Sequence, residues 1–332
     1  MENFFEVIAA FFKNIAAIFT AILVALGIMT PKPEEPKISQ TTVAVIEPFG
    51  SIRTVEGGCT DGHFVYQILI DPDAQSGVPC RLVKIDIQNW KVTEASEELK
   101  MDHANDMTYD EANNLLVVSN NKPNFTTITF VDPSNLTVRG TKTISRKIYS
   151  IVYVGSEKCW YAGISNSCDI VRFDENFKEL GVIDNPENNY TRQSLGSDGE
   201  YLYSLFYNPN IIFRYDLKGN PQGYAVLPDY ENEAENIFFI EGAMYVGYNI
   251  IKADAGGFIA RIDNAKFSAD APIPEPTTKT TTTKPATSSQ KAAKADKKRP
   301  AESRRPAGFY IVIYLRNPSV SSESSSALSS II

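Results

Sequence analysis

Val171-Arg172-Phe173-Asp174 is one of five copies of a short apolar strand that stops at an aspartate. The other copies are Val83–Asp86, Thr129–Asp132, Phe213–Asp216 and Ala260–Asp263, and successive aspartates lie 46, 42, 42 and 47 residues apart. A repeat of this length that contains strands and no helical periodicity is typical of a β-propeller, in which each repeat forms one blade. The sequence therefore predicts an all-β fold, a five-bladed β-propeller over residues 41–267.

The aspartate that closes each copy opens a turn. Turn-forming residues follow it, as in Pro133-Ser134-Asn135 after Asp132 and Lys218-Gly219-Asn220 shortly after Asp216. An Asp side chain can accept a hydrogen bond from the backbone N–H two residues further on, which stabilises such a turn. We interpret the five aspartates as turn residues and not as catalytic acids.

The fifth repeat has no outer strand of its own, because only residues 264–267 follow Asp263 before the composition changes. Thr41–Ile46 precedes the first repeat, has strand composition and lacks another partner. Pairing of this segment with the last blade would close the ring and remove an open sheet edge. The late apolar run Phe309–Leu315 is a weaker candidate for the same position.

The chain begins with a strongly apolar segment. Residues 15–29 carry no charge and the apolar character extends back to Val7, so residues 7–29 are long enough to cross a bilayer, which takes about 20 residues. We predict an N-terminal membrane helix within residues 1–30, a linker at 31–40 that starts with prolines, and a propeller on the extracellular side of the cell membrane. Two alternatives remain, which are a secreted protein with residues 1–27 cleaved as a signal peptide, and a buried or interfacial helix.

The region after the last repeat has a different composition. Residues 268–308 are rich in Thr, Pro, Ala and Lys, which predicts a disordered spacer, and residues 309–332 form an unassigned tail. Between 271 and 306 there are nine Lys/Arg and three acidic residues, so residues 1–270 carry a net charge of −14 against −8 for the whole chain. Such an acidic body argues against nucleic acid as a partner.

The cysteines and histidines predict no metal site and no cofactor. The four cysteines do not have zinc-ligand spacing, and two histidines are too few for a His-rich site. We expect buried thiols, with Cys159 and Cys168, on either side of a predicted hairpin turn at 165–167, as the one disulfide to consider. The stretch Asp71–Gly77 departs from a calcium loop at Ser76 and Leu82.

Two segments, His103–Tyr109 and Ile148–Tyr153, resemble repeats of bacterial, clostridial-type surface propellers. The phrase Val131-Asp132-Pro133 followed by Leu136 and Val138 is similar to repeats of the YVTN- and NHL-type propellers. The resemblance covers about residues 41–267 and implies the fold. It implies little about function, because these families include binding modules, lactonases and lyases.

Polar side chains gather where the first strand of each repeat begins. In propellers this strand lines the central channel, so the pairs that start it are expected to form a ring at one mouth. The pairs are Gly57-Gly58, Asn105-Asp106, Tyr149-Ser150, Arg192-Gln193 and Glu235-Asn236, with His103 just ahead of the second. Such groups suit hydrogen bonding to hydroxyl-rich ligands. We predict the ligand-binding residues Asn105, Asp106, Tyr149, Arg192, Gln193, Glu235 and Asn236, with an ordinary polar lining as the simpler alternative.

Three functions fit these observations. The leading hypothesis is a membrane-anchored extracellular binding module for a glycan or cell-wall component. The second is a hydrolase or lyase acting on a sugar or lactone, with Asp106 and Glu235 as acid and base and His103 assisting. The third is a rigid scaffold that binds a protein partner on the rim of the propeller.

Overall fold

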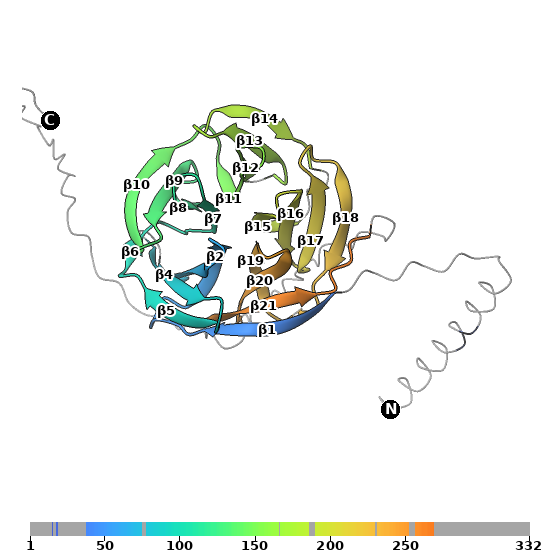
Figure 1. Ribbon diagram of the computed structural model, residues 1–332, viewed down its shortest axis with the longest axis horizontal. Coiled ribbons are helices and arrows are strands. Elements are labelled where there is room, and N and C mark those ends of the chain that lie inside the picture. The colour runs from blue at the N-terminus through green and yellow to red at the C-terminus, as the bar shows by residue number, and fades with distance from the viewer. Residues whose placement is uncertain are drawn as a thin grey trace, which may run out of the picture. The chain divides into compact units, whose positions relative to one another are not determined.

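The computed structural model describes residues 15, 18, 38–74, 78–165, 167–185, 190–229, 231–251 and 256–268. In these residues 21 strands form five antiparallel sheets around a central axis, with almost no helix (Figure 1). This arrangement confirms the five-bladed β-propeller. The first strand of each blade lies at the centre and the last one lies at the periphery.

The strands follow the predicted repeats closely. Blade 1 contains β2 (Thr54–Thr60), β3 (Phe64–Ile70), β4 (Pro79–Asp86) and β5 (Lys91–Ala95), and the short β6 (Leu99–Lys100) pairs with the start of β4. Blade 2 contains β7 (Asp106–Asp110), β8 (Leu115–Ser119), β9 (Thr127–Asp132) and β10 (Thr137–Thr143). Blade 3 contains β11 (Ile148–Val154), β12 (Cys159–Ile164), β13 (Ile170–Asp174) and β14 (Glu179–Ile183). Blade 4 contains β15 (Thr191–Ser197), β16 (Tyr201–Tyr207), β17 (Ile211–Asp216) and β18 (Pro221–Val226).

Blade 5 closes the ring with a strand from the beginning of the chain. It consists of β19 (Glu233–Ile240), β20 (Ala243–Asn249), β21 (Gly257–Asp263) and β1 (Ser39–Ile46). The register of β1 on β21 runs from Ser39 opposite Asp263 to Ile46 opposite Gly257. The predicted closure is therefore confirmed, with a strand that starts two residues earlier than predicted. The alternative run at 309–315 lies outside the described residues.

Apolar side chains fill the spaces between neighbouring blades. Five clusters of buried residues each join two adjacent sheets, and the cluster between blades 2 and 3 contains Val117, Ile151 and the fully buried Trp160. Burial of each large side chain is worth about 1.5–3 kcal/mol, so these contacts hold the ring together. The outer strands β5 and β10 are mostly exposed, which suits their polar sequences.

The closing aspartates act as turn residues, as predicted. The carboxylates of Asp86, Asp132, Asp174 and Asp216 each accept a hydrogen bond from the backbone N–H two residues on, at 2.8–3.0 Å. Asp263 differs because its outer strand comes from the other end of the chain. Its carboxylate accepts a hydrogen bond from Thr41 Oγ1 at 2.9 Å and so joins β21 to β1.

All four cysteines are buried free thiols. The disulfide considered between Cys159 and Cys168 does not form, and the strand register explains why the two thiols are far apart. Cys159 lies opposite Asp174 at one end of the β12–β13 hairpin, whereas Cys168 lies in the turn at the other end. Five residues of extended chain span about 16 Å, far more than a disulfide allows.

The other predicted segments lie largely outside the described residues. Of the predicted membrane segment the structure describes only Ile15 and Ile18, and it describes nothing after Ser268 of the predicted spacer and tail. Among the residues described, no helix is both long and apolar enough to span a bilayer.

Candidate functional site

The five inner strands β2, β7, β11, β15 and β19 surround the channel (Figure 1). We call the end where they begin the strand-start mouth and the end where they finish the strand-end mouth. The predicted pairs lie within the first five residues of these strands or, for Asn105, directly before one. Side chains from different blades meet there, since Asn105 Nδ2 donates to the carbonyl of Gln193 at 3.2 Å and Asn236 Nδ2 donates to the carbonyl of Glu56 at 2.5 Å.

Asp106 joins three blades at the centre of the channel. Its carboxylate accepts hydrogen bonds from the N–H of Ile151 (3.0 Å), the N–H of Leu195 (3.2 Å), the hydroxyl of Ser194 (2.9 Å) and its neighbour Met107 N–H (3.0 Å). The residue is fully buried. Burial raises the pKa of Asp106 to about 8, although the four donors favour the ionised form. The geometry therefore makes Asp106 a structural link between blades and leaves a ligand no access to it.

Blade 1 contributes glycines to the ring because the channel is narrow beside it. A Cβ added at Gly57 would lie 2.5 Å from the Asp106 Cα, and one at Gly58 would lie 2.7 Å from Asn236 Oδ1. Side chains cannot fit at these positions, so blade 1 approaches its neighbours with bare backbone. The nearest charged side chain of this blade is that of the preceding Glu56, which the sequence analysis did not select.

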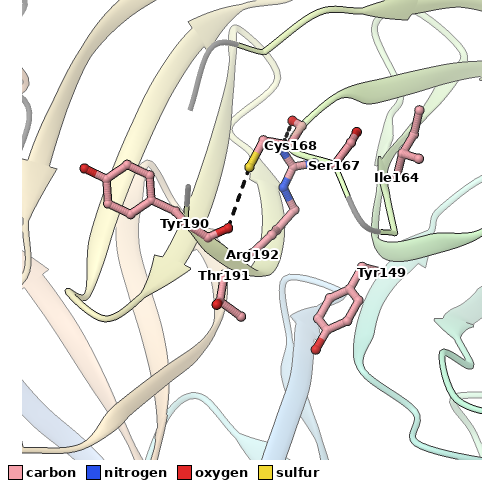
Figure 2. A pocket seen from close by; sticks show the side chains of 7 residues that line it. All are labelled: Tyr149, Ile164, Ser167, Cys168, Tyr190, Thr191 and Arg192. Carbon is pink, nitrogen blue, oxygen red and sulfur yellow. Dashed lines mark hydrogen bonds between the residues drawn. The ribbon is translucent and has the colours of Figure 1, made fainter. Parts of the chain in front are cut away.

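Arg192 holds a neighbouring turn. Its guanidinium donates to the carbonyl of Cys168 (Figure 2) and to that of Asp169 (3.2 Å), both in the β12–β13 turn of blade 3. It also lies over the ring of Phe206. Only 5% of Arg192 is exposed. Its hydrogen-bonding capacity is thus directed at the protein backbone.

Carboxylates form a compact group at the strand-start mouth. Gln193 Nε2 donates to Glu233 Oε1 at 2.9 Å and to Glu235 Oε2 at 3.0 Å, so one amide bridges two carboxylates. Burial, followed by the charges of Glu56 and Glu233, raises the pKa of Glu235 well above its ordinary value. Glu235 therefore holds its proton more strongly than an exposed glutamate does.

His103 and Tyr149 complete this group. His103 Nε2 lies 3.4 Å from Glu56 Oε1. Burial opposes the charged imidazolium, but the carboxylate of Glu56 outweighs it and raises the pKa of His103. Burial and the charges of Glu56 and Glu235 raise the pKa of the Tyr149 hydroxyl. His103, Tyr149 and Glu233 are only half-buried, so a ligand could reach them.

A pocket of 320 Å³ opens beside this group, between blades 3 and 4 (Figure 2). Two of its lining residues, Tyr149 and Arg192, were predicted as ligand-binding residues. The sequence analysis did not select the others, which are Ile164, Ser167, Cys168, Tyr190 and Thr191. Within the part of the chain that the structure describes, no group of three or more His, Cys, Asp or Glu side chains is arranged to hold a metal ion.

Of the predicted residues, the structure joins Asn105, Gln193 and Glu235 by hydrogen bonds. Asn236 is bonded to the Glu56 carbonyl instead, and Asp106 to backbone and hydroxyl donors of its own and two other blades. Tyr149 is the predicted residue with the greatest access. Glu56 and Glu233 were missed. Glu233 lies two residues before Glu235 on the same strand, so the alternation of side chains along a strand could have found it.

Neither a family model nor a curated protein sequence matches the chain. Among solved structures, the glutaminyl cyclase of Myxococcus xanthus is similar with a TM-score of 0.52 and 11% identity, over 69% of this chain and 99% of that chain. A streptogramin B lyase gives a TM-score of 0.38 and 13% identity, over 63% of this chain and 64% of that one. At 11% identity the first likeness supports the propeller fold alone. The resemblance to clostridial-type and NHL-type propellers stays a prediction.

Proposed function

We propose that this protein is a membrane-anchored extracellular binding module that recognises a glycan or cell-wall component at the strand-start mouth. The main support is the placement of half-buried Tyr149, His103 and Glu233 around the channel beside a pocket of 320 Å³. Carboxylate, phenol and imidazole groups donate to and accept from hydroxyl groups. Asp106, which is fully buried, would hold these residues in position and would not contact the ligand itself. Arg192 would hold the β12–β13 turn at the edge of the pocket that it lines.

Binding to an array of glycans and peptidoglycan fragments tests this proposal. Tyr149→Phe removes one hydroxyl and Glu233→Gln removes one charge without a change of shape. Each should weaken a real interaction about tenfold, because a hydrogen bond to a charged group is worth about 1.5–3 kcal/mol. Glu179→Gln, on the exposed strand β14, and Tyr201→Phe are matched controls that should leave affinity unchanged. Equal affinity in all four variants would place the binding elsewhere.

An enzyme is the second candidate, and the raised pKa of Glu235 favours it. A carboxyl group whose pKa is raised by burial and by neighbouring carboxylates is suited to act as a general acid on a sugar or lactone. Asp106 is a poor partner for it because all its acceptor capacity is used, so Glu233 or Glu56 would serve as the base. Turnover that Glu235→Gln abolishes, with binding retained, would favour a hydrolase or lyase. A folded protein that binds no glycan would favour the scaffold hypothesis.

A further inference from the structure

The strand-end mouth of the channel forms a funnel. A cavity of 370 Å³ at this end and a smaller one of 150 Å³ further inside share five lining residues, so the two are continuous. Each inner strand contributes one of them, and all five are half-buried. They are Thr60, Tyr109, Tyr153, Ser197 and Phe239.

Three of the five are aromatic and are held in place by neighbours. The ring of Tyr153 packs against Trp160 with centroids 4.7 Å apart, and the ring of Phe239 packs against Tyr203 at 4.7 Å. The hydroxyl of Tyr109 donates to Asn114 Oδ1 at 2.9 Å. The funnel is therefore built in advance, and little side-chain entropy would be lost when a ligand enters.

The mouth of the funnel is acidic. The turns that follow the inner strands carry one lysine, Lys158, and six acidic residues, which are Asp61, Glu111, Glu157, Asp198, Glu200 and Glu241. Glu157 is paired with Arg172 at 3.0 Å, while Asp61 and Glu111 line the cavity itself. The surplus of negative charge favours a cationic ligand.

The hydroxyl groups of Thr60 and Ser197 in the funnel already form hydrogen bonds within the protein. Thr60 Oγ1 donates to the carbonyl of Phe64 at 2.8 Å and accepts from the N–H of Gly62 at 3.0 Å. Ser197 Oγ does the same with Tyr201, at 2.7 Å, and Gly199, at 3.0 Å. Little hydrogen-bonding capacity remains at these two hydroxyls for a sugar, whereas Tyr109, Tyr153 and Phe239 line both cavities with aromatic residues. Aromatic faces with nearby carboxylates are the surroundings that attract an ammonium group.

We propose that the funnel is a second ligand site, independent of the strand-start mouth, which binds an organic cation with an aliphatic ammonium group. The rings of Tyr109, Tyr153 and Phe239 surround the cation and Glu111 and Asp61 provide the countercharge. Asp106 links blades 2, 3 and 4 across the channel between the two mouths, so each site works without the other.

Calorimetric titration of the full-length protein with choline and with n-butylamine tests the proposal and separates quaternary from primary ammonium ligands. The neutral choline isostere 3,3-dimethylbutanol has the same shape without the charge. We expect millimolar or tighter binding of at least one cation, weakened by added salt, and at least tenfold weaker binding of the isostere. Because Trp160 contacts Tyr153, its fluorescence should report binding in the funnel.

Variants decide whether the rings are responsible. Phe239→Leu keeps the bulk and removes the ring, and it should weaken cation binding about tenfold. Phe130→Leu is the matched control, since half-buried Phe130 packs against Phe177 between blades 2 and 3 and does not line either cavity. Glu111→Gln should weaken binding of the cation and not of the isostere. Equal binding of cation and isostere, equal effects of the two leucine variants, or no binding of either cation by folded protein would overturn the proposal.

Discussion

Replacing Asp106 with alanine is expected to destabilise the whole propeller and not one blade alone. The carboxylate accepts four hydrogen bonds from residues of blades 2, 3 and 4, and it is completely buried. Asp106→Ala leaves three backbone N–H groups and the hydroxyl of Ser194 without this acceptor. The hydroxyl can turn toward the carbonyl of Leu195, which is 3.5 Å away, so three donors remain unsatisfied.

A buried unsatisfied donor costs about 1–3 kcal/mol, and water that enters the space left by the carboxylate would recover part of this. We therefore expect the free energy of unfolding to fall by about 3–6 kcal/mol. That is a large share of the roughly 5–15 kcal/mol that stabilises an ordinary domain. Asp106→Asn keeps one acceptor oxygen and should fall between the alanine variant and the wild type.

Urea unfolding followed by tryptophan fluorescence and circular dichroism measures this difference. Asp110→Ala is the matched control, because Asp110 is a buried aspartate on the same strand whose carboxylate accepts only from Ala112 and Asn113 of its own turn. Its loss should cost about 1–2 kcal/mol, since those donors lie near solvent. A loss at Asp106 of less than 1 kcal/mol, or no larger than at Asp110, would refute the idea that Asp106 joins the blades.

Three further predictions concern the stability of the same framework. Gly57→Ala should destabilise the protein by about 2 kcal/mol or more, because its Cβ would lie 2.5 Å from the Asp106 backbone. Gly140→Ala is the control and should not destabilise it, because there is open space around Gly140. The midpoints of thermal unfolding of the two variants measure this difference. Deletion of residues 38–46 should unfold the propeller, because it removes β1 from blade 5. Deletion of residues 271–332 should leave the midpoint of thermal unfolding unchanged. Equal midpoints for the two deletion variants would contradict the closure of the ring by β1. Glu56 raises the pKa of His103 in the folded protein above its usual value of 6.5. The pair therefore stabilises the fold fully at pH values below the pKa of His103 in the unfolded chain. This contribution is lost as pH rises through the pKa of His103 in the folded protein. Urea midpoints of the wild type and His103→Gln should therefore converge toward pH 8, and parallel pH profiles would show that the pair contributes nothing.

The fold could be predicted from the sequence because its determinants are local. In blades 1 to 4 the third strand ends at an aspartate that accepts a hydrogen bond from the backbone two residues ahead, and this signal is visible in each of these repeats. The missing outer strand after Asp263 pointed to Thr41–Ile46, because pairing of this segment removes an open sheet edge. That long-range pairing followed from counting the strands of each repeat and needed no knowledge of side-chain contacts.

The candidate site was harder to predict because it depends on which polar side chains already form hydrogen bonds within the protein. The partners of Arg192 are two carbonyls of another blade, and those of Asp106 are N–H groups of two other blades. A polar residue at a channel position looks the same in sequence whether it faces a ligand or a backbone group. The sequence thus indicated that these residues begin the inner strands, but it could not separate Tyr149, which is half-buried, from the fully buried residues beside it.

The two mouths differ in chemistry because the two ends of the inner strands carry different side chains. At the strand-start mouth, burial and the charges of Glu56 and Glu233 raise the pKa of Glu235. At the strand-end mouth the hydroxyl groups of Thr60 and Ser197 close their own turns, and aromatic and acidic residues line the cavity. We therefore propose hydrogen-bonding ligands for the first mouth and organic cations for the second. One rigid ring can hold both chemistries because the blade-joining hydrogen bonds of Asp106 separate them.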